Sequence, residues 1–154
     1  MTPRIGIGYD SHRFADGRRL VLGGVEIEHE LGLDGHSDAD VVCHAVIDAL
    51  LGACGLGDLG THFPPDDERW RDADSIDMLR TVLGLLGGSV LNVDATVVCE
   101  APRLGPYRAE MERNLADALG APASVKATSN EGMGWIGRAE GIACVAAALV
   151  DVGP

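Results

Sequence analysis

The segment Gly8-Tyr9-Asp10-Ser11-His12-Arg13-Phe14 places a carboxylate two residues before an imidazole, directly after an apolar run that ends at Gly8. In an extended backbone successive side chains alternate between faces, so Asp10 and His12 point the same way and could bind one metal ion. Polar pairs at strand ends are more often explained by hydrogen bonding across a turn. The pair alone leaves both interpretations open, and a third ligand would decide between them.

His44 is the candidate for that third ligand. It follows Asp40 by one helical turn, in a segment of helical periodicity whose polar face could turn toward Asp10 and His12. Three ligands of mixed nitrogen and oxygen type suit zinc, and three protein ligands keep a coordination position open for a substrate. The alternative is that His44 is an ordinary surface residue of the helix, and spacing alone favours neither.

Three other stretches have the composition of binding loops. His36 and Ser37 precede the expected helix, where free N–H groups attract anions, although Ser37 could simply cap the helix. Residues 126–141 combine hydroxyls, a carboxylate and basic side chains with glycines, but they match no P-loop or dinucleotide fingerprint. Residues 57–67 are long for a connector and could carry recognition residues, although a solvated acidic loop is the ordinary interpretation.

Strands and helices that alternate along the chain must position these residues. We expect strands at 4–8, 93–99 and 123–128, and a hairpin at 19–27 that turns on Gly23-Gly24. We expect helices at 37–52, with Ser37 and Asp40 as a capping box, at 75–86, capped by Asp74, and at 106–119, closed by Gly120. Residues 141–152 form an apolar run without a decisive period, so they could be a strand or a helix. The pattern predicts an α/β (α+β) fold, a sheet with helices packed on one face.

Length and charge limit the function classes. With 154 residues, of which 46% are hydrophobic, the chain fits one domain spanning residues 1–154. The formal net charge is -12 and Lys126 is the only lysine, so no basic stripe exists and we expect no nucleic-acid partner. An acidic protein that binds a polyphosphate must neutralise it locally, with metal ions, backbone N–H groups and a few arginines.

The cysteines and the hydropathy bear on location and assembly. Cys43, Cys54, Cys99 and Cys144 are dispersed among apolar residues without a C-x-x-C pair, which is typical of core thiols in a reducing compartment. No apolar run has the length of a membrane span and no signal peptide is visible, so we expect a cytoplasmic protein without membrane contacts. The mean hydropathy of +0.10, with few aromatic residues, favours an oligomer whose subunits cover apolar surface.

Six motifs in order resemble the 2-C-methyl-D-erythritol 2,4-cyclodiphosphate synthases over nearly the whole chain: GYDSHRF, GHSDADVVxHA, LGDLGTHFP, DADS, NVDATVVxEAPR and KATSNEGMGWIGRAEGIA. The resemblance implies a homotrimer with active sites between adjacent subunits, and it favours a strand for residues 141–152. It also implies cyclisation of 4-diphosphocytidyl-2-C-methyl-D-erythritol 2-phosphate, with release of CMP, in the non-mevalonate isoprenoid pathway.

The resemblance further implies residue roles. Asp10, His12 and His44 would bind Zn²⁺, Glu131 would help hold a second divalent ion, Mg²⁺ or Mn²⁺, and His36 and Ser129 would stabilise the transition state. The implied substrate contacts are Ser37, Asp58, Leu59, Gly60, Phe63, Asp66, Asp67, Cys99, Glu100, Ala101, Pro102, Arg103, Leu104, Gly105, Thr128, Trp135 and Arg138. Of these, residues 99–105 would surround the cytosine of a substrate linked to cytidine diphosphate.

The chain departs from the common family pattern at Pro65, Gly105, Gly132 and Ala139, which puts pocket details in doubt but removes no metal ligand. Two other functions would use the same three ligands. A zinc-dependent phosphoesterase would release a linear product. A non-catalytic, metal-stabilised trimeric binding module would close the zinc with a fourth protein ligand and show no turnover.

Overall fold

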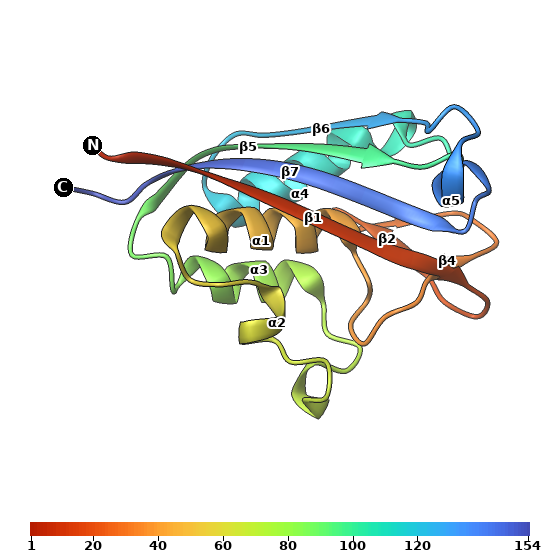
Figure 1. Cartoon of the computed structure of the whole chain (residues 1–154), viewed down its shortest axis with the longest axis horizontal. Helices are drawn as coiled ribbons and strands as arrows, with labels where there is room; N and C mark the ends of the chain where they lie inside the picture. The colour runs from red at the N-terminus through yellow and green to blue at the C-terminus, as the bar shows by residue number, and fades with distance from the viewer.

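A computed structural model describes all residues from Met1 to Pro154, and its main sheet has five strands in the order β4-β1-β7-β5-β6 (Figure 1). The strands are β1 (Pro3–Ala15), β4 (Gly32–Leu33), β5 (Ser89–Val98), β6 (Ala123–Thr128) and β7 (Gly141–Asp151). The β5–β6 pair is parallel and the other three pairs are antiparallel. The expected hairpin is present as β2 (Leu20–Leu22) and β3 (Val25–Ile27).

Three longer helices pack together with this sheet: α1 (Val41–Cys54), α3 (Ser75–Leu83) and α4 (Arg108–Leu119). Helix α1 lies on β1 and β7, α4 lies on β6, and α3 contacts both helices (Figure 1). The shorter helices are α2 (Leu59–His62), η1 (Glu68–Trp70), η2 (Gly105–Tyr107) and α5 (Gly134–Gly137). The mixed α/β fold predicted from the sequence is thereby confirmed, and none of the helices combines the length and apolarity needed to cross a membrane.

Two glycines set the distance between β1 and α1. Gly6 and Gly8 face the helix, and a Cβ added to either would lie 1.8 Å from a backbone carbonyl oxygen of α1, that of Ala49 or Ala45. No side chain fits there, because real Cβ contacts are never so short. The alternate residues Ile5, Ile7 and Tyr9 point away from the helix and are 73%, 73% and 54% exposed.

Several expected boundaries are wrong. The first strand does not end at Gly8 but runs to Ala15, because its polar continuation pairs with β7 as far as Arg13. Asp10 and His12 therefore lie within a strand and not at its end. Helix α3 ends at Leu83 and not at Leu86, and α4 begins at Arg108, after the 3-10 turn η2. The ambiguous stretch 141–152 is the strand β7, as the resemblance favoured.

Asp40, and not Ser37, caps α1, which begins at Val41 rather than at residue 37. The fully buried Asp40 carboxylate accepts hydrogen bonds from the N–H groups of Val42 and Cys43, and also from those of Gly23 and Gly24 in the β2–β3 turn. The helix N-terminus is therefore occupied by a carboxylate. The expectation that His36 and Ser37 stand beside free helix N–H groups is wrong for this reason.

Replacing Gly8 with alanine is expected to lower the free energy of unfolding by about 3 kcal/mol, because the new methyl group forces β1 away from α1. The matched control is Gly52→Ala on the same helix, where the added Cβ would meet only the Ile7 carbonyl oxygen, at 3.9 Å. That variant should gain about 0.5–1 kcal/mol, because alanine is the better helix former. Urea denaturation of both variants measures the difference, and equal stabilities would contradict the close-packing constraint.

Candidate metal centre and active site

Asp10, His12 and His44 converge as the sequence predicts. Asp10 and His12 continue the face of β1 that Gly6 and Gly8 turn toward α1, and His44 projects from the first turn of that helix. Asp10 Oδ2 lies 2.9 Å from His12 Nε2 and 3.1 Å from His44 Nδ1, and these two ring nitrogens are 3.3 Å apart. The three ligand atoms lie within 4.8 Å of one another, which suits a single metal ion.

The remaining nitrogen of each histidine is occupied by a partner behind the cluster. His12 Nδ1 lies 2.7 Å from the carbonyl oxygen of Asp34, which can only accept, so Nδ1 carries a proton, and in the neutral ring Nε2 keeps its lone pair for a metal ion. His44 Nε2 lies 2.9 Å from Ser75 Oγ and 3.2 Å from Ser37 Oγ. Partners of this kind orient metal-binding imidazoles, so the donor set fits a zinc ion.

The charges within the cluster act on one another. Burial alone would raise the pKa of Asp10, but hydrogen bonds from His12 and His44, and the charges of the two rings, lower this pKa to about 2. Burial alone would lower the pKa of His12, but its hydrogen bond to Asp10 and the Asp10 charge outweigh that effect and raise the pKa. The carboxylate is therefore ionised at neutral pH and available as a ligand.

A pocket of about 230 Å³ opens over this cluster. Of the residues that the resemblance assigns to the substrate or the transition state, five line it: His36, Ser37, Leu59, Gly60 and Phe63. Its wall also contains Pro65 and two residues that the sequence did not indicate, Trp70 and Met78. Trp70 packs edge-on against Phe63 at a centroid distance of 4.7 Å.

A second, larger pocket of about 430 Å³ collects most of the residues expected around cytosine and the diphosphate. Its lining comprises Cys99, Glu100, Pro102, Arg103, Leu104, Gly105, Pro106, Ala127, Thr128 and Ser129. It shares no lining residue with the pocket over the metal cluster, and Glu131 does not belong to that cluster. Within one chain the expected site is therefore divided into two separate halves.

Several expected contacts line neither of these pockets: Asp58, Asp66, Asp67, Ala101, Glu131, Trp135 and Arg138. The Asp58 carboxylate caps α2, and the Asp67 carboxylate caps η1 and pairs with Arg69. Trp135 lines another pocket of about 220 Å³ together with His12, while Arg138 pairs with Glu140.

Comparison with known proteins shows the family to which the chain belongs. Residues 3–151 match the YgbB family. The chain is 57% identical to the 2-C-methyl-D-erythritol 2,4-cyclodiphosphate synthase of Symbiobacterium thermophilum, covering 95% of this chain and 97% of the relative. It is 55% identical to the enzyme of that name from Salinibacter ruber, covering 96% and 98%.

A solved structure described as 2C-methyl-D-erythritol-2,4-cyclodiphosphate synthase, bound form CDP, superposes with a TM-score of 0.87 at 36% identity. The alignment covers 96% of this chain and all of the other. The match spans both half-sites and nearly every element of the fold. This chain belongs to the YgbB family.

Proposed function

We propose that this chain is a 2-C-methyl-D-erythritol 2,4-cyclodiphosphate synthase, a phosphorus–oxygen lyase of the non-mevalonate isoprenoid pathway. It converts 4-diphosphocytidyl-2-C-methyl-D-erythritol 2-phosphate into the 2,4-cyclodiphosphate and CMP. The observation that carries the proposal is the convergence of Asp10, His12 and His44 beneath a pocket, in a chain that matches the named enzymes over nearly its whole length.

The metal cluster would hold Zn²⁺ through Asp10 Oδ2, His12 Nε2 and His44 Nδ1. Three protein ligands leave one tetrahedral position for the substrate, in keeping with a catalytic rather than a structural zinc. When bound, the zinc ion polarises a phosphoryl oxygen and offsets the repulsion between phosphate groups. The exposed Glu131 is the proposed ligand of the second divalent ion, Mg²⁺ or Mn²⁺.

The reaction needs no nucleophile from the protein. An oxygen of the substrate's 2-phosphate forms a bond to the β-phosphorus, the bond from that phosphorus to the bridging oxygen breaks, and CMP leaves with that oxygen. The chain's residues align the two phosphates, which can lower the barrier by roughly 7–11 kcal/mol when the geometry is near ideal. His36 and Ser129 then stabilise negative charge on the phosphoryl oxygens. His36 Nε2 donates to the Asp67 carbonyl at 2.9 Å, which fixes its ring at the pocket wall.

The cytidine half of the substrate would occupy the pocket built from residues 99–106 and 127–129. The related structure described as a CDP-bound form supports a cytidine diphosphate ligand. The methylerythritol half would lie in the pocket over the metal cluster, against Leu59, Gly60 and Phe63. A substrate of this kind must bridge the two half-sites.

A homotrimer would bring the half-sites together. On the sheet face opposite α1, Ile5, Ile7, Tyr9 and Val145 are exposed on the neighbouring strands β1 and β7, and no element of the chain covers them. An apolar patch of this kind marks a protein interface. Three copies would cover it, and each active site would join the metal pocket of one subunit to the cytidine pocket of its neighbour.

Glu100 supports the loop that carries Ser129 and Glu131. Its Oε1 accepts hydrogen bonds from the N–H groups of Asn130, at 3.0 Å, and Gly132, at 3.1 Å. These two amides flank Glu131, whose φ of 53° lies in the left-handed region and needs support from its surroundings. Glu100 would therefore position the loop as well as line the cytidine pocket.

Phosphorus NMR of the purified protein with the cytidyl substrate, zinc and magnesium tests the proposed function. The wild type and the control variant His29→Ala should produce CMP and a cyclic diphosphate. The His44→Ala variant should lose at least about 100-fold in rate, because one metal ligand is missing. A linear phosphate product would instead identify a phosphoesterase, and a zinc-bound trimer without turnover would identify a binding module.

Ile7→Asp tests the trimer, because it places a charge in the middle of the apolar sheet face. Sedimentation should show a trimer for the wild type and a monomer for the variant, since a buried unpaired charge costs several kcal/mol. The control is Leu85→Asp, which changes another exposed apolar side chain that lies outside the sheet. Dissociation of both variants, or of neither, would contradict an interface on this face.

Glu100→Ala should release the Asn130 and Gly132 amides from their common acceptor. Hydrogen exchange at these two amides should accelerate by about tenfold, as expected for the loss of roughly 1.5 kcal/mol per hydrogen bond to a charged group. CDP should also bind more weakly. Glu100→Gln keeps one carbonyl acceptor, so its exchange rates should fall between those of the wild type and Glu100→Ala. Unchanged exchange in the alanine variant would refute this role.

A further inference from the structure

The Nε2 side of His44 meets two serine hydroxyls, and these differ in what they can do. Ser75 Oγ lies 2.9 Å from Nε2 and Ser37 Oγ lies 3.2 Å from it. Ser37 Oγ also accepts the N–H of Ala39, at 3.2 Å. The Ser37 hydroxyl hydrogen remains free to point at Nε2, so Ser37 alone would accept either tautomer of the His44 ring.

Ser75 permits only one of these tautomers, because Asp38 determines the direction of its hydroxyl. Ser75 Oγ donates a hydrogen bond to Asp38 Oδ1, because a carboxylate oxygen can only accept. The Ser75 hydrogen is therefore used on Asp38, and the lone pairs of Ser75 Oγ face His44. Nε2 must carry a proton and donate it to Ser75, so in the neutral ring Nδ1 keeps its lone pair for a metal ion.

The Asp38–Ser75 pair is held rigidly. Ser75 is the first residue of α3 and is fully buried, and its backbone N–H donates to Asp38 Oδ2 at 3.1 Å. Asp38 thus holds Ser75 through both carboxylate oxygens. The Asp38 backbone N–H donates in turn to the carbonyl of Ala73, at 3.1 Å. The pair joins the loop before α1 to the start of α3, directly behind His44.

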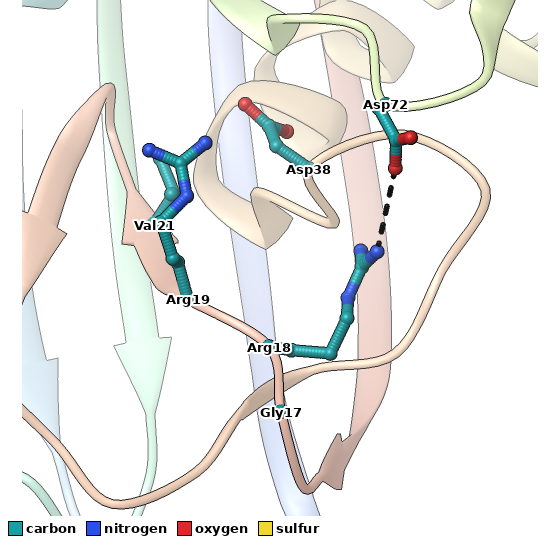
Figure 2. A pocket seen from close by; sticks show the side chains of 6 residues that line it. All are labelled: Gly17, Arg18, Arg19, Val21, Asp38 and Asp72. Carbon is teal, nitrogen blue, oxygen red and sulfur yellow. Dashed lines mark ion pairs between the residues drawn. The ribbon is translucent and has the colours of Figure 1, made fainter.

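Asp38 also lines a pocket that contains two arginines. Figure 2 shows Asp38 in the lining of a pocket of about 280 Å³, together with Arg18, Arg19 and Asp72. Arg18 pairs with Asp72 at 3.7 Å, and the Arg18 guanidinium also donates to the carbonyl oxygens of Leu33 and Ser37. Arg19 pairs with Glu26 at 3.3 Å, so both guanidinium groups in this pocket have carboxylate partners other than Asp38.

We infer that Asp38 and Ser75 are positioning residues for the metal centre, acting as a carboxylate–hydroxyl relay that presents His44 Nδ1 as a zinc ligand. The inference rests on the proposed zinc site. It adds two residues to that site: Ser75, whose hydroxyl contacts the cluster only at His44 Nε2, and Asp38, which acts through Ser75. The relay resembles the partners that orient metal-binding histidines elsewhere, except that the carboxylate acts through a serine.

Zinc affinity in the absence of substrate tests the relay. Competition with a chromophoric chelator should show binding about 10–100-fold weaker for Ser75→Ala than for the wild type. Ser75→Thr keeps the hydroxyl and should recover most of the affinity. Ser124→Ala removes an exposed serine hydroxyl on β6 and should match the wild type. Thermal unfolding of each variant confirms that it is folded. If Ser75→Ala does not fold, Asp38→Asn is the variant to measure. Its amide leaves the direction of the Ser75 hydroxyl undetermined, so zinc binding should also be weaker than in the wild type.

The ring proton of His44 gives a second readout that a merely structural serine would not change. In the zinc-bound wild type, nitrogen–proton NMR should show a slowly exchanging, downfield Nε2 proton, and Ser75→Ala should lose it to fast exchange with water. Wild-type zinc affinity together with a retained Nε2 proton in Ser75→Ala would overturn the inference and leave the proposed reaction untouched. A zinc-binding wild type that does not cyclise the substrate would overturn the reaction and leave the relay standing. A wild type that binds no zinc would overturn both.

Discussion

The close contact between β1 and α1 is the constraint on which the rest of the structure depends. Gly6 and Gly8 let the strand lie against the carbonyl groups of the helix, at a distance that no side chain permits. The same face of β1 continues into Asp10 and His12, and the same helix carries His44 one residue before Ala45, whose carbonyl Gly8 meets. The metal cluster is thus an extension of a packing interface. Its geometry is set by backbone contact rather than by flexible side chains.

Side chains alternate between the two faces of β1, and the two faces have different roles. The face toward α1 is made of glycines and metal ligands, while Ile5, Ile7 and Tyr9 occupy the other face and remain exposed. A trimer built on that second face would use the apolar half of the strand for assembly and the polar half for chemistry. The two separate pockets of a single chain fit this division, because each holds a different part of the expected substrate contacts.

Local spacing predicted that Asp10 and His12 share a strand face, and the resemblance to a known family assigned His44 as the third ligand, which spacing alone left open. The start of α1 was not predictable from local spacing. Asp40 caps this helix, and its carboxylate also accepts hydrogen bonds from Gly23 and Gly24, which lie outside the local sequence pattern. The Asp38–Ser75 pair was missed for a similar reason: the residues are 37 positions apart, and each looks like an ordinary capping or loop residue. Residues 141–152 show no alternation of polar and apolar residues, because alanines on both faces of β7 make the buried and exposed faces similar in hydropathy.

The most direct test of this account is a crystal structure of the zinc-bound protein, with anomalous diffraction recorded at the zinc absorption edge. The account predicts one strong peak per chain between β1 and α1, bonded to Asp10 Oδ2, His12 Nε2 and His44 Nδ1 at about 2.0–2.2 Å, with a fourth position open to solvent or substrate. A peak elsewhere, coordination through His44 Nε2, or a fourth protein ligand that closes the site would contradict it.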